Sequence, residues 1–400
     1  MTEHTVLRQA IEPLIADYLA TGVPAAAIEV RRDNQVLLRH AWGRIDEASA
    51  PCTLDTRFDL ASLTKLFTTT ALLTLVARGR VALDDPLVAH VPDFGGPARG
   101  YDGGVDPHSK QPLPMNDALT GQAQDPQRVT LRHLLTHSSG LAAWRPVYAA
   151  AGPPPVPPDQ VDPVPRAERW RRGLAFVVSA PFVDPIGARV RYSDLGFMLL
   201  GEVVARLHGG DLKQAIAELV LRPAGLTTIT YSPMQHGVPR ALIAPTEDDP
   251  AWRGRRIWGE VHDENACGLG GVAGHAGLFG ALQDVAQFGE TWRSAPQVWG
   301  MSTDLRAEAT SPHIIYEGEA RGLGWLIRTP ELLSTGRHMP DGAHGHTGFT
   351  GTSLWIDPFH RLTVVILTNS VYVGRHIFDP RPLRQAVHEA IYEALGLAAS

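Results

Sequence analysis

The sequence contains little cysteine and little lysine, and it has no long apolar run. Its two cysteines, Cys52 and Cys267, are too few for a disulfide framework. No stretch approaches the roughly 20 apolar residues that a membrane-spanning helix needs. The N-terminus also lacks the basic start and the apolar segment of a signal peptide. These absences predict a cytoplasmic protein with no membrane partner.

The charge pattern and the missing motifs exclude further classes. The net charge is -6 and no basic patch stands out, so nucleic acid is not an expected partner. No P-loop, G-x-S-x-G or H-E-x-x-H motif occurs, and the glycines of residues 268–273 follow no strand-like run. We therefore predict no nucleotide site and no cofactor. The sequence does not predict an oligomeric state.

Both ends of the chain predict strands and a helix. Apolar residues recur with helical spacing at 4–21, and two strand-like runs follow at 25–32 and 35–43, joined by a turn at Asp33-Asn34. Near the C-terminus the strand-like runs are 322–328, 352–357 and 361–369, and the helical run is 382–397. The fold class that follows is α/β of the α+β kind, with an antiparallel sheet built from both chain ends and flanked by helices.

The middle of the chain predicts helices separated by long irregular stretches. The helical runs are 66–79, 131–137, 168–178, 196–207 and 212–221. Two loops, 95–127 and the proline-rich 152–165, are too long and too irregular to be ordinary connections, and such loops often cover a site. We therefore expect an α/β lobe formed by 1–60 and 266–400, a mostly helical lobe formed by 61–265, and an active site in the cleft between them.

The chain has only three lysines, and one of them, Lys65, follows Ser62 by three residues at the start of a predicted helix. Positions i and i+3 share a helix face, so the ammonium can reach the hydroxyl. Asp59 or Ser62 can cap this helix. A desolvated lysine has a lowered pKa and can accept the proton of serine, whereas arginine cannot. The pair predicts a serine nucleophile with a lysine base; a capped helix with a surface lysine is the alternative.

Two further segments carry polar groups beside glycine or a helix start. Tyr192 stands between a strand-like run and a helix, where its phenol can carry a proton. The alternative is a partly buried tyrosine that precedes a helix cap at Ser193 or Asp194. The His-Thr-Gly of residues 346–348 is predicted to open a strand, and the glycines around it let a ligand approach the backbone closely. Its alternative is a glycine-rich hairpin turn.

In this order the three segments resemble the serine β-lactamase and penicillin-binding-protein superfamily. The pattern there is S-x-x-K, then Y-x-N or S-x-N, then K-T-G or H-T-G. This chain has SLTK at 62–65, YSD at 192–194 and HTG at 346–348. It is most similar to the class C branch, which includes D-alanyl-D-alanine carboxypeptidases, family VIII esterases and muropeptide amidases. Supporting stretches are LRHLLTHSSGL at 131–141 and GGVAGHAGLFGALQDVAQF at 270–288.

The resemblance implies roles for individual residues. Ser62 would be the acylated nucleophile, and Lys65 and Tyr192 would share the proton transfers. The backbone N–H groups of Ser62 and Phe349 would form the oxyanion hole. The residues that would contact the substrate are Asp194, His346, Thr347 and Gly348.

Two of these positions depart from the family pattern. Asp194 replaces the usual Asn, and its charge would raise the pKa of Lys65 and oppose its use as a neutral base. His346 replaces the commonest residue, Lys, and its positive charge would fade above its pKa. We therefore predict weak or absent β-lactamase activity and a function as an esterase, peptidase or amidase.

A polar segment at 258–279 groups His262, Asp263 and His275. One interpretation is a loop whose side chains bond to its own backbone. Another is a substrate-binding loop beside the cleft, as the resemblance to carboxypeptidase-like and amidase members implies. A metal site with His344 and His346 is the third, but no recognised ligand spacing occurs, so we expect no metal.

The sequence thus predicts a serine hydrolase that forms an acyl-enzyme on Ser62. Its substrate would be a small molecule or peptide with an amide or ester bond. The alternative from another functional class is a catalytically silent member that binds peptides or muropeptides as a sensor.

Overall fold

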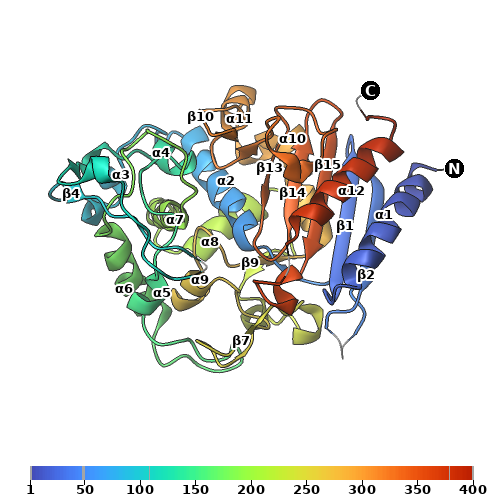
Figure 1. Cartoon of the computed structure of the whole chain (residues 1–400), viewed down its shortest axis with the longest axis horizontal. Coiled ribbons are helices and arrows are strands. Elements are labelled where there is room, and N and C mark those ends of the chain that lie inside the picture. The colour runs from blue at the N-terminus through green and yellow to red at the C-terminus, as the bar shows by residue number, and fades with distance from the viewer. Residues whose placement is uncertain (1, 47–49, 108, 378, 399–400) are drawn as a thin grey trace.

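The computed structural model describes residues 2–46, 50–107, 109–377 and 379–398 (Figure 1). Its centre is an eight-stranded sheet in the order β10-β11-β12-β13-β14-β15-β1-β2, with every neighbouring pair antiparallel. The strands of this sheet are β1 (Ala25–Arg32), β2 (Gln35–Gly43), β10 (Ile314–Tyr316), β11 (Glu319–Arg321), β12 (Leu326–Ile327), β13 (His344–Thr347), β14 (Ser353–Asp357) and β15 (Leu362–Thr368).

Pairing between β1 and β15 joins the two ends of the chain, with Ile28 opposite Ile366. The predicted sheet from both termini is therefore confirmed. The predicted hairpin is confirmed as well, since β1 and β2 pair across the turn at Asp33 and Asn34. Both turn residues have positive φ, 52° and 67°, as a two-residue hairpin turn requires.

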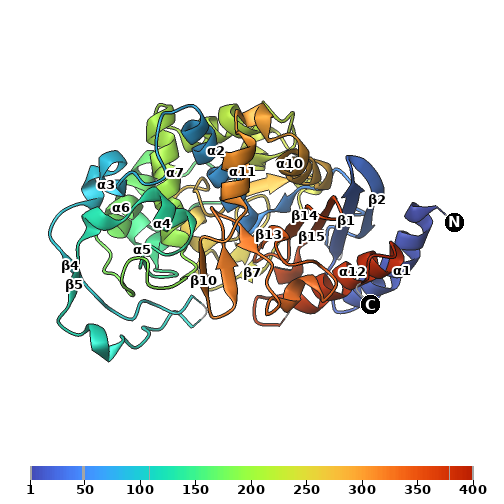
Figure 2. The same ribbon diagram turned by 90° about the horizontal axis from the view of Figure 1, so that it is seen from above.

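Helices cover both faces of the sheet. Figure 2 shows α10 (Leu282–Ser294) on one face, and α1 (Glu3–Leu19) with α12 (Arg381–Ala394) on the other. Successive residues of a strand point to opposite faces. Accordingly Ala25 and Ala27 of β1 join the core on the α10 side, while Ile28 and Val30 join the core against α1 and α12.

The other end of the molecule is mostly helical (Figure 1). Its helices are α2 (Thr64–Ala77), α3 (Leu87–His90), α4 (Leu131–Leu135), α5 (Val147–Ala151), α6 (Arg166–Val178), α7 (Asp194–His208), α8 (Leu212–Ile216) and α9 (Glu264–Gly268), and a separate helix, α11 (Thr303–Ala309), precedes β10. Both α2 and α7 are buried along most of their length, as expected of helices that are apolar on all sides. The helix predicted over 212–221 is not continuous, because α8 ends at Ile216 and a π-helical turn continues to Leu221.

A small sheet connects the two regions and places the start of α2. It consists of β3 (Phe58–Asp59), β9 (Leu278–Gly280) and β6 (Thr230–Tyr231). The remaining short strands are β4 (Arg99–Gly100), β5 (Ala123–Gln124), β7 (Asp248–Asp249) and β8 (Arg255–Arg256). Across the described residues, no helix combines the length and the apolarity needed to cross a bilayer.

Candidate active site

Ser62 lies in a 3₁₀ turn, Ala61–Leu63, between β3 and α2. Asp59 holds this turn. Its Oδ1 accepts a hydrogen bond from the Ala61 N–H at 2.8 Å, and its Oδ2 accepts one from the His262 N–H at 2.6 Å. The prediction that Asp59 or Ser62 caps the helix is wrong, because α2 begins only after the 3₁₀ turn and its N-cap, Leu63, makes no side-chain cap. The Ser62 hydroxyl is left for other contacts.

The central contact of the site joins Lys65 to Ser62. The Lys65 side chain is fully buried, and its Nζ donates to Ser62 Oγ at 2.9 Å and to the His275 carbonyl oxygen at 3.2 Å. The same Nζ lies 2.8 Å from Asp194 Oδ1. The predicted reach from position i+3 to position i is therefore present in the structure.

Asp194 raises the pKa of Lys65. Burial lowers this pKa, but the Asp194 carboxylate and Tyr192 outweigh burial and raise it above the ordinary lysine value. The expectation that desolvation makes Lys65 neutral is therefore wrong, and the expected effect of Asp194 is right. At neutral pH Lys65 is an ammonium paired with a carboxylate.

Tyr192, the predicted second proton carrier, lies beside Lys65. The Lys65 Nζ lies 4.7 Å from the centre of its ring, and both Lys65 and Ser62 are near enough to its hydroxyl to lower its pKa. Burial raises the pKa of Tyr192; Lys65 lowers it in part and Asp194 raises it further, so the phenol is protonated at neutral pH. Both groups that can exchange a proton with Ser62 thus hold their protons at rest.

Asp194 is the first residue of α7, and Ser193 is its N-cap. The Ser193 Oγ accepts from the Gly196 N–H at 3.3 Å and donates to the Ala142 carbonyl at 2.7 Å. Of the two predicted caps, Ser193 is the correct one. This cap leaves the Asp194 carboxylate available for Lys65, at a helix end where backbone N–H groups favour negative charge.

Phe349 lies in the turn between β13 and β14, and this turn is bonded to the segment before Ser62. Thr350 Oγ1 donates to the Asp59 carbonyl at 2.8 Å, and Thr352 Oγ1 donates to the Leu60 carbonyl at 3.2 Å. Only glycine fits at position 348, because an added Cβ would lie 2.8 Å from Leu60 O. The turn therefore brings Phe349 to the pocket that Ser62 also lines.

His346 and Thr347 end a strand rather than opening one, because β13 begins at His344. His346 is buried, with its ring centre 5.9 Å from that of Tyr192, and its Nδ1 bonds to the Thr347 carbonyl at 2.8 Å. Burial, followed by the charges of Lys65 and Arg321, holds the pKa of His346 well below 6.5. The imidazole is therefore neutral at working pH. The expected positive charge on His346, which would fade above its pKa, is already absent near neutral pH.

The polar segment around residue 263 bonds to its own backbone and also contacts residues of the site. Asp263 is the N-cap of α9, accepting from the Ala266 N–H at 2.7 Å, and it lies 2.9 Å from His275 Nε2. Burial raises the pKa of Asp263, but His275 and the Ala266 N–H outweigh it and lower this pKa. The His262 ring stacks on Phe349 with 5.6 Å between ring centres. In the described part of the chain, no three His, Cys, Asp or Glu side chains are grouped to hold a metal.

These residues meet at a pocket of about 180 Å³. The predicted site residues that line it are Ser62, Tyr192, Asp194, His262, Asp263 and Phe349. Lining residues that were not predicted are Lys110, Trp144, Glu264 and Arg375. The sequence signals for two of them were the length of the 95–127 loop, which contains Lys110, and the polar segment 258–279, which contains Glu264. Lys65, His275 and residues 346–348 lie behind this lining.

The cations of this pocket have carboxylate partners. Lys110 Nζ lies 3.4 Å from Glu264 Oε1 and 4.1 Å from the centre of the Trp144 ring. Arg375 is 2.8 Å from Glu264 and also pairs with Glu247. Around Ser62, the pocket therefore combines apolar walls with charges that are already paired.

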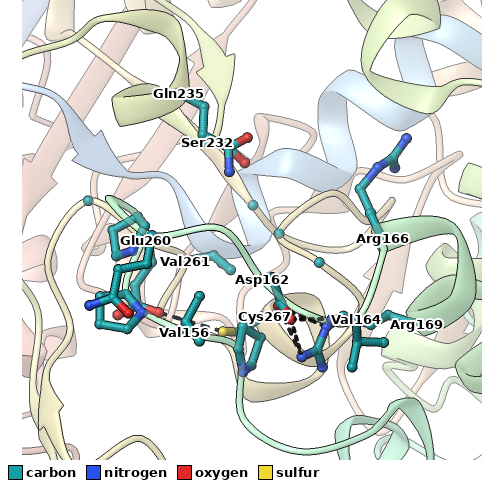
Figure 3. Close-up of a pocket in the computed structure, with 18 of the residues that line it drawn as sticks. Val156, Asp162, Val164, Arg166, Arg169, Ser232, Gln235, Glu260, Val261 and Cys267 are labelled. Atoms are coloured by element: carbon teal, nitrogen blue, oxygen red, sulfur yellow. Dashed lines mark hydrogen bonds and ion pairs between the residues drawn. The ribbon is translucent and has the colours of Figure 1, made fainter.

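A second pocket, of about 250 Å³, lies next to the first and is drawn in Figure 3. Glu260, Val261 and Cys267 line the second pocket, whereas residues 262–264 line the first, so one short segment separates them. Its charged side chains are paired: Asp162 with Arg169, Glu260 with Arg255, and Arg166 with Asp211. Burial raises the pKa of the Cys267 thiol to about 12, so this thiol is not a nucleophile at neutral pH.

Known proteins resemble this chain over nearly its whole length. The sequence model of the Beta-lactamase family matches residues 7–388. A protein of Escherichia coli (strain K12), named provisionally as a D-alanyl-D-alanine carboxypeptidase, is 29% identical over 382 residues, covering 89% of this chain and 80% of that protein. An N-acetylmuramyl-L-alanine amidase of Bacillus subtilis (strain 168) is 28% identical over 426 residues, covering 96% of this chain and 88% of that protein.

A solved structure shows the same fold. EstCE1, described as a hydrolase with promiscuous acyltransferase activity, has a TM-score of 0.69 and 20% sequence identity, with 97% of this chain and 99% of that chain covered. The fold, the Ser62–Lys65–Tyr192 cluster and the family match agree. This chain belongs to the beta-lactamase family and is a serine hydrolase of that family.

Proposed function

We propose that the protein hydrolyses a neutral ester or amide through an acyl-enzyme on Ser62. The observation that supports this most is the 2.9 Å contact between Ser62 Oγ and the fully buried Nζ of Lys65, with Tyr192 beside both, at a pocket. If Lys65 were only a surface lysine on a capped helix, its ammonium would stay in water, because burying a charge costs free energy unless the charge is paired.

The proton transfers follow from the pairing of Lys65 with Asp194. Lys65 rests as an ammonium, and moving its proton from Nζ to Oδ1 over 2.8 Å leaves a neutral amine that can act as a base. Lys65 then accepts the Ser62 proton as Ser62 Oγ attacks the carbonyl carbon. Tyr192 passes its proton to the leaving group and is reprotonated by Lys65. In the second half of the reaction, Lys65 accepts a proton from water as the water oxygen attacks the acyl carbon. The bond from that carbon to Ser62 Oγ then breaks, Tyr192 passes its proton to Ser62 Oγ and is reprotonated by Lys65, and the proton on Asp194 returns to Lys65.

The oxyanion of the tetrahedral intermediate would accept hydrogen bonds from the backbone N–H groups of Ser62 and Phe349. The bonded turn 348–352 supports this role, because it fixes Phe349 relative to the segment before Ser62. One such donor typically contributes about 3–4 kcal/mol to the transition state.

The charges of the pocket favour a neutral substrate. Lys110 and Arg375 are both paired with Glu264, and His346 is neutral. A terminal carboxylate on the substrate would therefore find every lysine and arginine that lines the pocket already paired with a carboxylate. The apolar walls include Trp144 and Phe349. We therefore favour an esterase, or an amidase that cleaves away from a free carboxylate, over a D-alanyl-D-alanine carboxypeptidase. The named relatives include both a carboxypeptidase and an amidase.

A substrate panel tests this proposal. We expect hydrolysis of p-nitrophenyl acetate or butyrate, weak or absent turnover of nitrocefin, and little release of D-alanine from D-Ala-D-Ala peptides. Muropeptides with and without free carboxylates would show whether an amide is the natural target. A fluorophosphonate probe should label the wild type but not Ser62→Ala. Failure to label the wild type would favour the silent sensor, and nitrocefin turnover exceeding ester hydrolysis would overturn the substrate assignment.

A further inference from the structure

His137, which follows α4, lies against Tyr192 and has an unusual backbone. It belongs to the LRHLLTHSSGL stretch, is 1% exposed, and has φ of +56°. A residue with a bulky side chain seldom adopts this left-handed conformation unless its surroundings enforce it, and such residues cluster at functional sites. The contacts of His137 show what its surroundings hold in place.

His137 bonds to the residues on both sides of Tyr192. Its carbonyl oxygen accepts from the Arg191 N–H at 2.7 Å, and its Nδ1 accepts from the Ser193 N–H at 3.0 Å. The backbone of Tyr192 is therefore fixed at both ends by one residue. The Ser193 bond also sets the beginning of α7, and so the position of Asp194.

The ring of His137 also packs against the Tyr192 ring itself. Their centres are 4.6 Å apart with the planes tilted by 38°, and Phe197 lies 5.1 Å from the imidazole. The tyrosine has Lys65 4.7 Å from its ring centre. His137 thus limits how far the phenol can move away from Ser62 and Lys65.

The imidazole of His137 is neutral and has one tautomer. Because Nδ1 accepts from Ser193, the proton is on Nε2. The groups that face the ring are Tyr192, Lys65, Arg321 and His346, and burial together with the charges of Arg321 and Lys65 holds the pKa of His137 well below 6.5. A proton added at Nδ1 would remove the acceptor of the Ser193 N–H bond, so His137 does not itself carry protons at working pH.

We infer that His137 is a positioning residue, which holds Tyr192 at Ser62 and Lys65 by accepting the Ser193 N–H bond. The inference rests on the proposed function, in which Tyr192 carries a proton. It assigns a role in catalysis to a residue of the 131–141 stretch that does not line the pocket.

Two substitutions isolate the hydrogen bond. Asn and Gly both adopt positive φ readily, but only Asn offers an acceptor, Oδ1, close to the place of Nδ1. We expect His137→Asn to keep kcat for p-nitrophenyl acetate within about fivefold of the wild type. His137→Gly should lower kcat by about 10- to 100-fold, since small displacements of a catalytic group have effects of this order. KM should change little in either variant.

Three controls define the outcome. Thermal unfolding shows that each variant is folded at the assay temperature, and His388→Asn, in a fully buried histidine of α12, should leave kcat unchanged. The pH–rate profile of His137→Asn should keep the limbs of the wild type, because His137 does not titrate there. Equal kcat for the Asn and Gly variants, or a lost limb in the Asn profile, would overturn the inference.

Failure of the role assigned to His137 can be distinguished from failure of the proposed function. If the Gly variant does not fold, the Asn variant alone decides: kcat within about fivefold of the wild type supports the inference, and a larger loss contradicts it. If the wild type fails to react with a fluorophosphonate, the proposed function itself fails. A labelled wild type with equal Asn and Gly variants removes only the role of His137.

Discussion

The protonation of Lys65 depends most on one neighbouring residue, Asp194. The carboxylate lies 2.8 Å from Nζ and raises the pKa of the lysine against the effect of burial. The i, i+3 spacing identified Ser62 and Lys65 as neighbours, and the family resemblance added Tyr192. Neither could give the balance between burial and charge that sets the pKa of Lys65. That balance depends on Asp194, which is 129 residues away in the chain and is brought close only by the fold.

Asp194→Asn tests this balance through the pH dependence of the reaction. Asp194 raises the pKa values of both Lys65 and Tyr192, so removing its charge lowers both. A proton acceptor with a lower pKa is unprotonated at lower pH. The acid limb of the kcat/KM profile should therefore move to lower pH, measured with p-nitrophenyl butyrate. An acid limb that stays in place or moves to higher pH would contradict the assigned charge balance.

Lys65→Arg tests whether proton transfer, rather than charge, is required at this position. Arginine keeps the positive charge but does not release its proton. We expect kcat to fall by about 10²–10⁴-fold, the usual contribution of a general acid–base group. Lys213→Arg, in α8 and away from the pocket, is the matched control and should retain wild-type activity. A Lys65→Arg variant with kcat near the wild type would rule out lysine as a base.

At the scale of elements, the turn 348–352 connects the sheet to the start of α2. Strand-like runs of apolar residues predicted β1, β2, β14 and β15 well. They did not predict β13, because its sequence, HGHT, has no apolar alternation and its place follows from pairing with β12 and β14. The sequence also could not show that Thr350 and Thr352 bond to Asp59 and Leu60, which are almost 300 residues away in the chain.

Gly348→Ala tests the fit of this turn. An added Cβ would lie 2.1 Å from Thr352 Oγ1 and 2.8 Å from Leu60 O, so the turn must move and the Phe349 N–H moves with it. We expect a loss in kcat of about 10- to 1000-fold, the range seen when an oxyanion donor is lost. Gly100→Ala is the control, since its Cβ would have no neighbour closer than 4.0 Å. Equal kcat in the two variants would show that the turn does not hold the oxyanion site.

At the scale of the whole molecule, the sheet separates two cores with different tasks. The core between α10, α2 and the sheet extends to the site, whereas the core beneath α1 and α12 lies on the far face (Figure 2). Both terminal helices were predictable from their spacing of apolar residues. The length of the 95–127 loop predicted only that such a loop could cover a site. The contact of Lys110 with Glu264 depends on the tertiary structure, so the sequence did not predict it.

Ile391→Ala tests this separation. Ile391 of α12 is fully buried in the far core, and removing its side chain should lower the free energy of unfolding by about 2–5 kcal/mol. Urea unfolding followed by circular dichroism measures this loss. The kcat of the folded variant should equal that of the wild type, since Ile391 belongs to the far core, whose buried residues include none of the site residues. A large fall in kcat without loss of stability would contradict the assignment of the far core to stability alone.

The central claim is that the acyl group of the substrate is attached to Ser62, and trapping the intermediate tests it most directly. The protein is mixed with p-nitrophenyl acetate, quenched in acid within the first turnovers, digested and examined by peptide mass spectrometry. Acetyl on Ser62 in the wild type, and its absence in Ser62→Ala, is the predicted result. Acetyl on another residue, or rapid hydrolysis by Ser62→Ala, would contradict the account.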